Sequence, residues 1–279
     1  MLKVLAIESI LKQGSSLPAI VTSESGKKYL LKFRGAGEGS LNSISEFIAA
    51  SLGNHIGLPV LKPELLTLGN DTINKVKNDE LYDLIKWSEG INIGFEFIEK
   101  AVSFESSDNL KLDVEIKSLI YLYDLFLLNI DRNKGNSNVI ISEGRIIATD
   151  YGSSFLIRYL INNETVVADA RIIAELRRNP FYSIAPDPRL LTDRFKSVSE
   201  KILKSIVDDI PNNWIDAGLT SAVSIKKYLM ENLNRLMNDP AHLSGVIRMV
   251  DQSVPVTDEE RQLQRYKNLN LFKERFGKM

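Results

Sequence analysis

Residues 121 to 153 read YLYDLFLLNIDRNKGNSNVIISEGRIIATDYGS, and this stretch decides the fold. It begins with an apolar segment whose only charge is Asp124, and polar residues gather at the end of that segment. Two aliphatic runs follow, joined by the turn sequence SEG at 142–144, and the second run leads into TDYG at 149–152. The pattern predicts a helix, a loop and a β-hairpin, with an acid where the chain leaves the hairpin.

The predicted hairpin brings two acids to one place. Because two strands joined by a tight turn return the chain to its starting point, we expect Asp150 to lie near the loop that holds Asp131, Asn136 and Asn138. Clusters of carboxylate and amide oxygens suit Mg²⁺, which completes its shell with water and substrate phosphates. The sequence therefore predicts a site for phosphoryl transfer, a reaction in which the protein mainly positions groups and neutralises charge.

The composition of the 279 residues is that of a soluble globular protein, with 44% hydrophobic and 25% charged residues. A formal net charge of -1 provides no global positive field, so we expect no direct binding to nucleic acid or to a membrane surface. The sequence has no cysteine and only two histidines, which excludes cysteine nucleophiles and argues against a multi-histidine zinc site. Since residues 1–12 lack the apolar core of a signal peptide, we expect a cytosolic protein.

Three short strands are predicted at residues 3–10, 18–23 and 28–34, with the spacing of an antiparallel meander. The first turn contains Gly14, Ser15 and Ser16, which is either a plain turn or a loop whose N–H groups approach a phosphate.

Further along, residues 69–90 are polar and are expected to form an irregular surface excursion, and residues 92–99 read as another strand. We place a boundary near residue 100, which divides the chain into a β-rich part, 1–100, and a helical part, 101–279.

Lys32 and Glu46 each admit two interpretations. Alternation along the strand puts Lys32 on the face opposite Leu31 and Phe33, where it is either solvated or reaches the phosphates of a nucleotide. Glu46 lies in a helix predicted over residues 44–56, where it either completes a capping box with Ser43 or forms an ion pair with Lys32. The sequence alone does not separate these alternatives.

Beyond residue 152, residues 153–190 are mixed and the later part of the chain is predicted to be helical. Apolar periodicity indicates helices around residues 168–178, over 192–210 and over 221–237. Thr257 and Glu260 form a capping-box pattern that opens a last helix toward Phe276. The helix over residues 114–128 is apolar on nearly all sides, which is typical of a helix at the centre of a helical lobe.

The ordered series of motifs resembles the protein-kinase-like fold, an α+β fold with a small antiparallel β-rich N-lobe and a larger helical C-lobe. In detail the chain is similar to the HipA-like kinase family, particularly its single-domain members. The segments that carry the resemblance are GSSLPAIV (14–21), YLLKF (29–33), SEFIAASLGNHIGLPV (45–60), NIDRNKGNSNVII (129–141) and ATDYGSSF (148–155). They extend over about half of the chain.

The resemblance implies an ATP- and Mg²⁺-dependent kinase. Asp131 would accept or orient the substrate hydroxyl, Asp150 would bind Mg²⁺ in the place of the Asp-Phe-Gly aspartate, and Lys32 would hold the α and β phosphates. The amide ligand would be Asn138, which directly precedes a strand, or Asn136, which has the kinase spacing from Asp131. We favour Asn138 and keep Asn136 as a second contact.

Other residues acquire expected roles from the same resemblance. Lys134 and Arg132 are the candidates for neutralising the transferred phosphoryl group. The connecting segment over 93–100, with Glu96, Phe97 and Ile98, would border the nucleotide, as would Glu46 and the turn at Gly14, Ser15 and Ser16. Phosphorylation of Ser15 or Ser16 would switch activity off, because it brings negative charge into a loop that receives phosphate.

The acceptor and the partners are the least constrained expectations. The first interpretation is a Ser/Thr protein kinase with a protein substrate, capable of autophosphorylation and held in check as a toxin by an antitoxin or other regulatory protein. A small-molecule or lipid-alcohol kinase of the same fold and a pseudokinase or adaptor are the alternatives. A metal-dependent phosphodiesterase would leave Lys32 unexplained.

Overall fold

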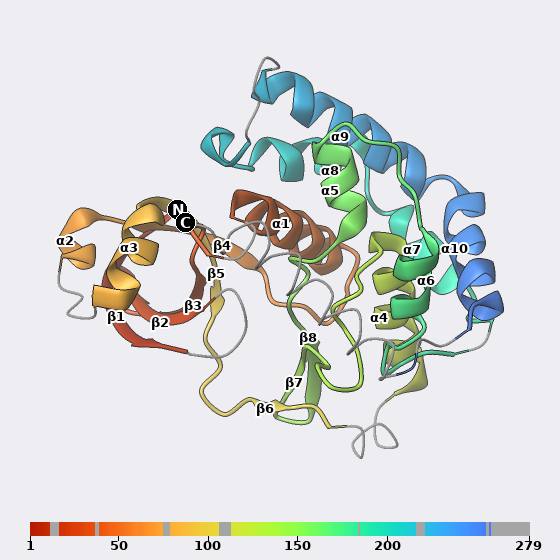
Figure 1. Cartoon of the computed structure of the whole chain (residues 1–279), viewed down its shortest axis with the longest axis horizontal. Helices are drawn as coiled ribbons and strands as arrows, with labels where there is room; N and C mark the ends of the chain where they lie inside the picture. Colours follow the sequence, from red (N-terminus) through yellow and green to blue (C-terminus); the bar gives the residue numbers. More distant parts are fainter. Residues whose placement is uncertain are drawn as a thin grey trace, which may run out of the picture.

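The computed structural model of the chain describes residues 1–11, 17–36, 39–74, 79–105, 113–183, 185–215, 221–254 and 257. A β-barrel occupies one side of the molecule and a group of helices the other, with helix α1 (Ser40–His55) between them (Figure 1). The mixture of one barrel and separate helices confirms the α+β class.

Five strands form the barrel, in the order β1 (Leu2–Ile10), β2 (Ala19–Ser23), β3 (Lys28–Lys32), β5 (Gly90–Glu96) and β4 (Pro63–Leu68). The first three strands form the antiparallel meander that the sequence predicts. β5 pairs antiparallel with both β3 and β4. The barrel closes where β1 pairs in parallel with β4, with Leu2 opposite Leu66.

Alternate side chains of the strands fill the barrel. Its core consists of Val4, Ala19, Val21, Tyr29, Leu31, Phe33, Ala36, Leu66, Leu68, Ile73 and Ile85. The last two come from the short helices α2 (Asn70–Ile73) and α3 (Asp79–Trp87), which cover one end of the barrel (Figure 1). The expectation of an irregular excursion over residues 69–90 is therefore wrong, because burying these two isoleucines removes apolar surface from water.

Helix α1 is longer than predicted and begins four residues earlier. Its N-cap is Gly39, whose φ of 69° lies in the left-handed region that suits glycine. Ser43 and Glu46 both lie within the helix and are buried, so the capping-box interpretation of this pair is wrong. α1 packs against β4 and β5 on one side and against the later helices on the other.

A larger hydrophobic core holds the helical part together. Its helices are α4 (Val114–Leu127), α5 (Phe155–Ile161), α6 (Ala170–Leu176), α7 (Arg189–Phe195), α8 (Glu200–Asp208), the 3-10 helix η2 (Asn212–Trp214), α9 (Ala222–Met237) and α10 (Pro240–Gln252). α4 is buried throughout Leu119 to Leu127, as its apolar sequence predicts. None of the described helices is long and apolar enough to cross a lipid bilayer.

One expectation for the helical part needs correction. The single helix expected over residues 192–210 is two helices, because Ser199 caps a new one by accepting a hydrogen bond from the Ile202 N–H. α10 was not predicted. The helix expected from Thr257 toward Phe276 lies outside the described residues.

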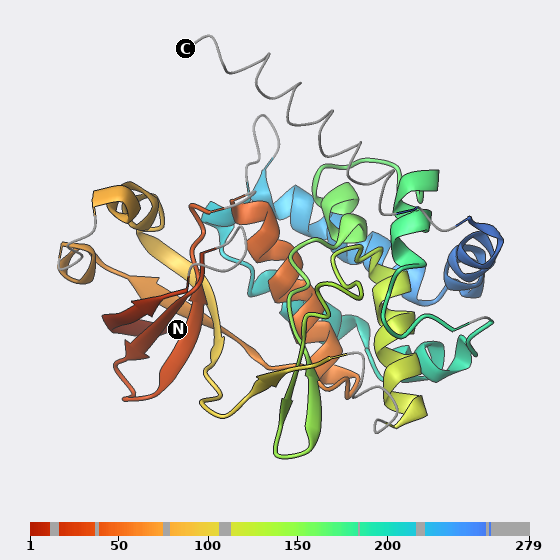
Figure 2. The same ribbon diagram turned by 60° about the horizontal axis from the view of Figure 1, so that its bottom comes forward.

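The predicted hairpin is formed by β7 (Val139–Ser142) and β8 (Arg145–Ala148), and β6 (Val102–Ser103) adds a third strand to it. Figure 2 shows the hairpin between the barrel and the helices. Its base is tied to the segment after α1, where the Ala148 N–H donates to the Pro59 carbonyl at 2.7 Å. This contact places the exit of the hairpin near α1.

Candidate functional site

A cleft of about 880 Å³ is lined by residues from the barrel, from α1, from the loop after α4 and from the exit of the hairpin. Of the residues predicted to form the site, those that line it are Lys32, Glu46, Glu96, Phe97, Ile98, Asp131, Lys134, Asn136, Asn138 and Asp150. Gly14, Ser15 and Ser16 lie outside the described residues. Segments far apart in the sequence thus meet at one cavity.

Lys32, the last residue of β3, makes two ion pairs across this cleft. Its Nζ lies 2.9 Å from Glu46 Oε2 and 2.8 Å from Asp150 Oδ1, and its side chain is 15% exposed. The interpretation of Lys32 as a solvated surface lysine is therefore wrong. The structure contains the ion pair between Glu46 and Lys32, which was the alternative interpretation of Glu46.

The charges of the three side chains depend on one another. Burial acts to lower the pKa of Lys32, but Asp150 and Glu46 raise it above its ordinary value overall. Lys32 lowers the pKa of Asp150 in spite of the burial of that carboxyl group. Burial raises the pKa of Glu46, which Lys32 opposes and Asp150 reinforces. Lys32 and Asp150 are therefore a charged pair at neutral pH.

Asp131 lies in the loop after α4 and contacts Asn138. The Asn138 Nδ2 donates to Asp131 Oδ2 at 3.3 Å, whereas the Asn136 Nδ2 donates to the main-chain carbonyl of Asp131 at 3.4 Å. Burial and the nearby Asp150 raise the pKa of Asp131, and the two asparagines act in the opposite direction. Of the two amides, the one that donates to the Asp131 carboxylate is therefore that of Asn138.

The backbone of the hairpin brings the second acid to this loop. The Thr149 N–H donates to the Asn138 carbonyl at 2.8 Å. The residue before Asp150 is therefore hydrogen-bonded to Asn138, whose side chain contacts Asp131. Asn138 and Asp150 both have positive φ, 47° and 60°, a conformation that residues with a Cβ seldom adopt. The structure thus confirms that the hairpin returns Asp150 to the loop of Asp131.

The groups at this end of the cleft that could bind a metal ion all offer oxygen atoms. They are the carboxylates of Asp131 and Asp150 and the amide oxygen of Asn138. The described residues hold no group of three or more His, Asp or Glu side chains arranged to bind a metal ion. A cation here would therefore complete its shell with water and phosphate oxygens, which is how Mg²⁺ is usually bound beside nucleotides. The donor chemistry fits Mg²⁺ and a nucleotide together better than a metal held by protein alone.

Arg132 is not a cleft residue, and the expectation that it neutralises the transferred phosphoryl group is wrong. Its side chain is fully buried, and its Nε lies 2.7 Å from Asp124 Oδ2. The rest of the guanidinium donates to main-chain carbonyls. Lys134, in contrast, is exposed and lines the cleft, so it is the cation of this loop that can approach a phosphoryl group.

Sequence reasoning missed several residues that shape the site. Asp124 binds Arg132, and its signal in the sequence was its position as the lone charge of an apolar helix. Arg158 of α5 donates to Asn42 Oδ1 on α1 at 2.7 Å and to the Gly152 carbonyl at 3.3 Å. It therefore ties the segment after Asp150 to the helix that carries Glu46.

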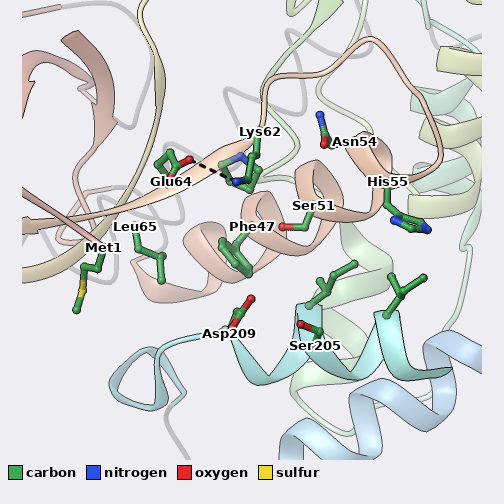
Figure 3. Close-up of a pocket in the computed structure, with 13 residues that line it drawn as sticks. Met1, Phe47, Ser51, Asn54, His55, Lys62, Glu64, Leu65, Ser205 and Asp209 are labelled. Carbon is green, nitrogen blue, oxygen red and sulfur yellow. Dashed lines mark ion pairs between the residues drawn. The ribbon is translucent and has the colours of Figure 1, made fainter. Parts of the chain in front are cut away.

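A second cavity, of about 530 Å³, lies on another face of α1 (Figure 3). Phe47 and Ser51 of α1 line it together with residues of β4 and α8. Its ion pair, between Lys62 and Glu64, spans 3.7 Å, and both residues are on the same segment. This cavity contains none of the residues predicted for phosphoryl transfer, so the larger cleft is the candidate active site.

Comparison with known proteins found solved structures that are similar to this chain. A kinase of Helicobacter pylori, the proinflammatory kinase CtkA, has a similar structure, with a TM-score of 0.52 and 13% sequence identity over 88% of this chain and 96% of that chain. The Golgi casein kinase has a TM-score of 0.46 with 12% identity, over 92% of this chain and 77% of that one. A structure of the same enzyme with Mn/ADP bound has a TM-score of 0.42 with 11% identity, over 90% and 73%.

The likeness to the H. pylori kinase shows a kinase-like fold. No curated protein sequence matches the chain. The family model described as HipA-like kinase, however, matches residues 4–242. This match covers most of the chain, including the cleft with Lys32, Asp131 and Asp150, and the chain therefore belongs to the HipA-like kinase family.

Proposed function

We propose that this protein is an ATP- and Mg²⁺-dependent phosphotransferase that transfers the γ-phosphoryl group to Ser or Thr hydroxyls of a protein. The observation that carries the proposal is that Lys32 from the barrel and Asp131, Asn138 and Asp150 from the helical part line one cleft. Family membership supports the reaction class. The protein acceptor is the part of the proposal that rests on the family resemblance alone.

Lys32 is held ready for an anion. An ammonium has three N–H donors, and Glu46 and Asp150 each accept one of them. A third donor is therefore left for an α- or β-phosphate oxygen. Glu46 approaches Lys32 from α1, so it keeps the ammonium at the cleft when Asp150 has another partner.

Asp150 and Asn138 are the residues that would hold the metal ion, with Asn136 as a second contact. When bound, Mg²⁺ supplies positive charge that neutralises the phosphate oxygens. Asp131 orients the acceptor hydroxyl and takes its proton on a carboxylate oxygen, a role for which its raised pKa makes it a better base than an ordinary aspartate. Lys134 contributes positive charge from the exposed side of the same loop.

The two-lobe arrangement expected from the resemblance is part of this proposal. The barrel would be the N-lobe and the helices the C-lobe, joined by the segment after β5. Glu96, the last residue of β5, and Phe97 and Ile98 of that segment line the cleft and would contact the base of the nucleotide. A regulatory partner of the antitoxin type, autophosphorylation at Ser15 or Ser16 and a cytoplasmic location stay predictions.

The decisive experiment is phosphoryl transfer by the purified protein with Mg²⁺ and labelled ATP, offered a cell lysate as the source of acceptors. Asp131→Asn should lower the rate by about 10²- to 10⁴-fold, the effect of losing a positioned base. The matched control is Asp187→Asn, which removes an exposed carboxylate paired with Arg189 and should leave the rate unchanged.

Mass spectrometry of the products identifies the acceptor. Labelled Ser or Thr residues in protein support the proposal, and a labelled metabolite without labelled protein would make the chain a small-molecule kinase instead. Equal incorporation by the wild type and Asp131→Asn would contradict the phosphotransferase proposal as a whole.

A further inference from the structure

Beneath the cleft lies a buried group of polar residues centred on Asp124. Its carboxylate is fully buried and accepts three hydrogen bonds: from Asn129 Nδ2 at 2.9 Å, from Arg132 Nε at 2.7 Å and from Asn179 Nδ2 at 2.7 Å. The donors come from the end of α4, from the loop of Asp131 and from the segment after α6. A buried carboxylate is costly unless its oxygens are satisfied, and here they are.

The Arg132 guanidinium extends from this carboxylate to the backbone of the cleft. Its Nη1 donates to the carbonyls of Ser137, at 2.9 Å, and of Asn138, and its Nη2 donates to the Thr149 carbonyl at 3.2 Å. The guanidinium carbon also lies 5.0 Å from the centre of the Tyr151 ring. One side chain thus contacts the backbone on both sides of the hairpin and the residue after Asp150.

The hydrogen bonds of Arg132 lie at or beside Asn138 and Asp150, the two residues that would hold the metal ion. Arg132 contacts the carbonyl of Asn138 itself and the carbonyl directly before Asp150. Both residues have positive φ, so their backbones are in a conformation that needs support from neighbouring contacts. The planar fork of a guanidinium can hold several carbonyls at fixed spacing, which a lysine ammonium cannot do.

We propose that Arg132, oriented by Asp124, is a positioning residue that sets the spacing of Asn138 and Asp150 and thereby the affinity of the cleft for a divalent cation. The inference rests on the proposed function, and it assigns this buried pair a role beyond that of a core ion pair. A purely structural pair would contribute to folding and leave the metal dependence of the folded protein unchanged. Residues that orient metal ligands typically contribute 10- to 100-fold to metal affinity.

The test uses the full chain and compares nucleotide binding with and without Mg²⁺ by calorimetry. Arg132→Lys keeps the charge but loses the fork, and we expect it to lower the gain in ADP affinity caused by Mg²⁺ by about 10-fold or more. Binding of ADP without metal should keep its wild-type affinity, since Arg132 does not line the cleft. Asp124→Asn, which keeps the size of the side chain, should produce a smaller loss of the same kind.

Lys226→Met is the matched control. Lys226 is also a largely buried cation whose Nζ donates to main-chain carbonyls, those of Asp208 and Ile210, but it belongs to α9 and does not line the cleft. Its loss should lower the midpoint of thermal unfolding and leave the Mg²⁺-dependent gain at the wild-type value. The control therefore separates a general loss of stability from a loss of metal affinity.

The outcomes are distinct. A wild-type gain from Mg²⁺ in folded Arg132→Lys and Asp124→Asn would overturn the positioning role while leaving the proposed function intact. A wild-type protein whose ADP binding does not respond to Mg²⁺ would instead overturn the proposed function. If Arg132→Lys does not fold, Asp124→Asn carries the test, because its amide fills the same space but lacks the negative charge that pairs with the Arg132 guanidinium.

Discussion

Lys32 and Asp150 are 118 positions apart in the sequence, and their side chains meet with Nζ 2.8 Å from Oδ1. This contact joins the barrel to the exit of the hairpin. Glu46 holds the same ammonium from α1, so three separate segments converge on one charge. The proposed kinase activity depends on that convergence.

Replacing Lys32 by methionine should lower kcat/KM for ATP by about 10²-fold or more, the usual effect of removing one donor that stabilises developing charge. The variant should fold, because burial favours protonation of Glu46 once the lysine is gone. Lys28→Met is the control on the same strand, where the lysine is exposed and pairs with Glu99. Steady-state kinetics that show equal losses for both lysines would contradict a specific role for Lys32.

The two asparagines of the loop should differ in their effect on the metal requirement. Asn138→Gly removes the amide and keeps a residue that tolerates positive φ, and it should raise the half-saturating Mg²⁺ concentration by about 10- to 100-fold. Asn136→Ala should have a much smaller effect, because the Asn136 amide donates to the main-chain carbonyl of Asp131, whereas the Asn138 amide donates to the carboxylate. A larger effect of Asn136→Ala in Mg²⁺ titrations of the rate would assign the ligand to Asn136.

The rate should fall on the acid side at a higher pH than an ordinary aspartate would produce. Asp131 must be ionised to act as a base, and burial together with Asp150 raises its pKa above the ordinary 3.8. The active, ionised form is therefore lost as the pH falls through that raised pKa. Lys32 does not add an alkaline limb near neutrality, because its own pKa is raised.

A profile of kcat/KM against pH, measured between the limits at which the protein stays folded, checks this expectation. The acid limb should be absent from the residual activity of Asp131→Asn. A wild-type profile that stays flat down to the ordinary carboxyl range would show that Asp131 does not titrate as the base.

Two glycine-to-alanine changes, one in the barrel and one in α10, should have opposite effects on the stability of the protein. A Cβ at Gly94 of β5 would collide with the Leu66 side chain inside the barrel, so Gly94→Ala should destabilise the protein by about 1–3 kcal/mol. Gly245 of α10 has open space around it, so Gly245→Ala should be stabilising by up to about 1 kcal/mol through helix propensity. Denaturant unfolding monitored by circular dichroism measures both, and equal stability of the two variants would contradict the packing described for β4 and β5.

The site could be predicted because its elements have strong local signals. The turn between two aliphatic runs predicts the hairpin, and a hairpin returns Asp150 to the loop of Asp131. The parallel pairing of β1 with β4 was not predictable, because strands so distant in the chain leave no local pattern of their partnership. The insertion of Ile73 and Ile85 into the barrel was missed because the polar residues around them suggest surface.

The prediction for Arg132 was wrong because the sequence does not show in which direction its side chain points. The sequence around Arg132 reads the same whether this arginine faces the cleft or the core, and its direction depends on a partner that pairs with its charge. That partner is Asp124, eight residues earlier, whose isolation in an apolar helix was the available clue. A lone charge in a buried helix should therefore prompt a search for a buried cation nearby.

Calorimetric titration of the wild type and Asp150→Asn with ADP, each with and without Mg²⁺, tests whether this cleft binds a metal ion and a nucleotide together. We expect Mg²⁺ to tighten ADP binding by the wild type, and we expect Asp150→Asn to lose most of this gain, because the variant lacks the proposed metal-binding carboxylate next to Lys32. Absence of any ADP binding by the wild type, or an undiminished Mg²⁺ gain in Asp150→Asn, would contradict the assignment of this cleft as a metal-nucleotide site.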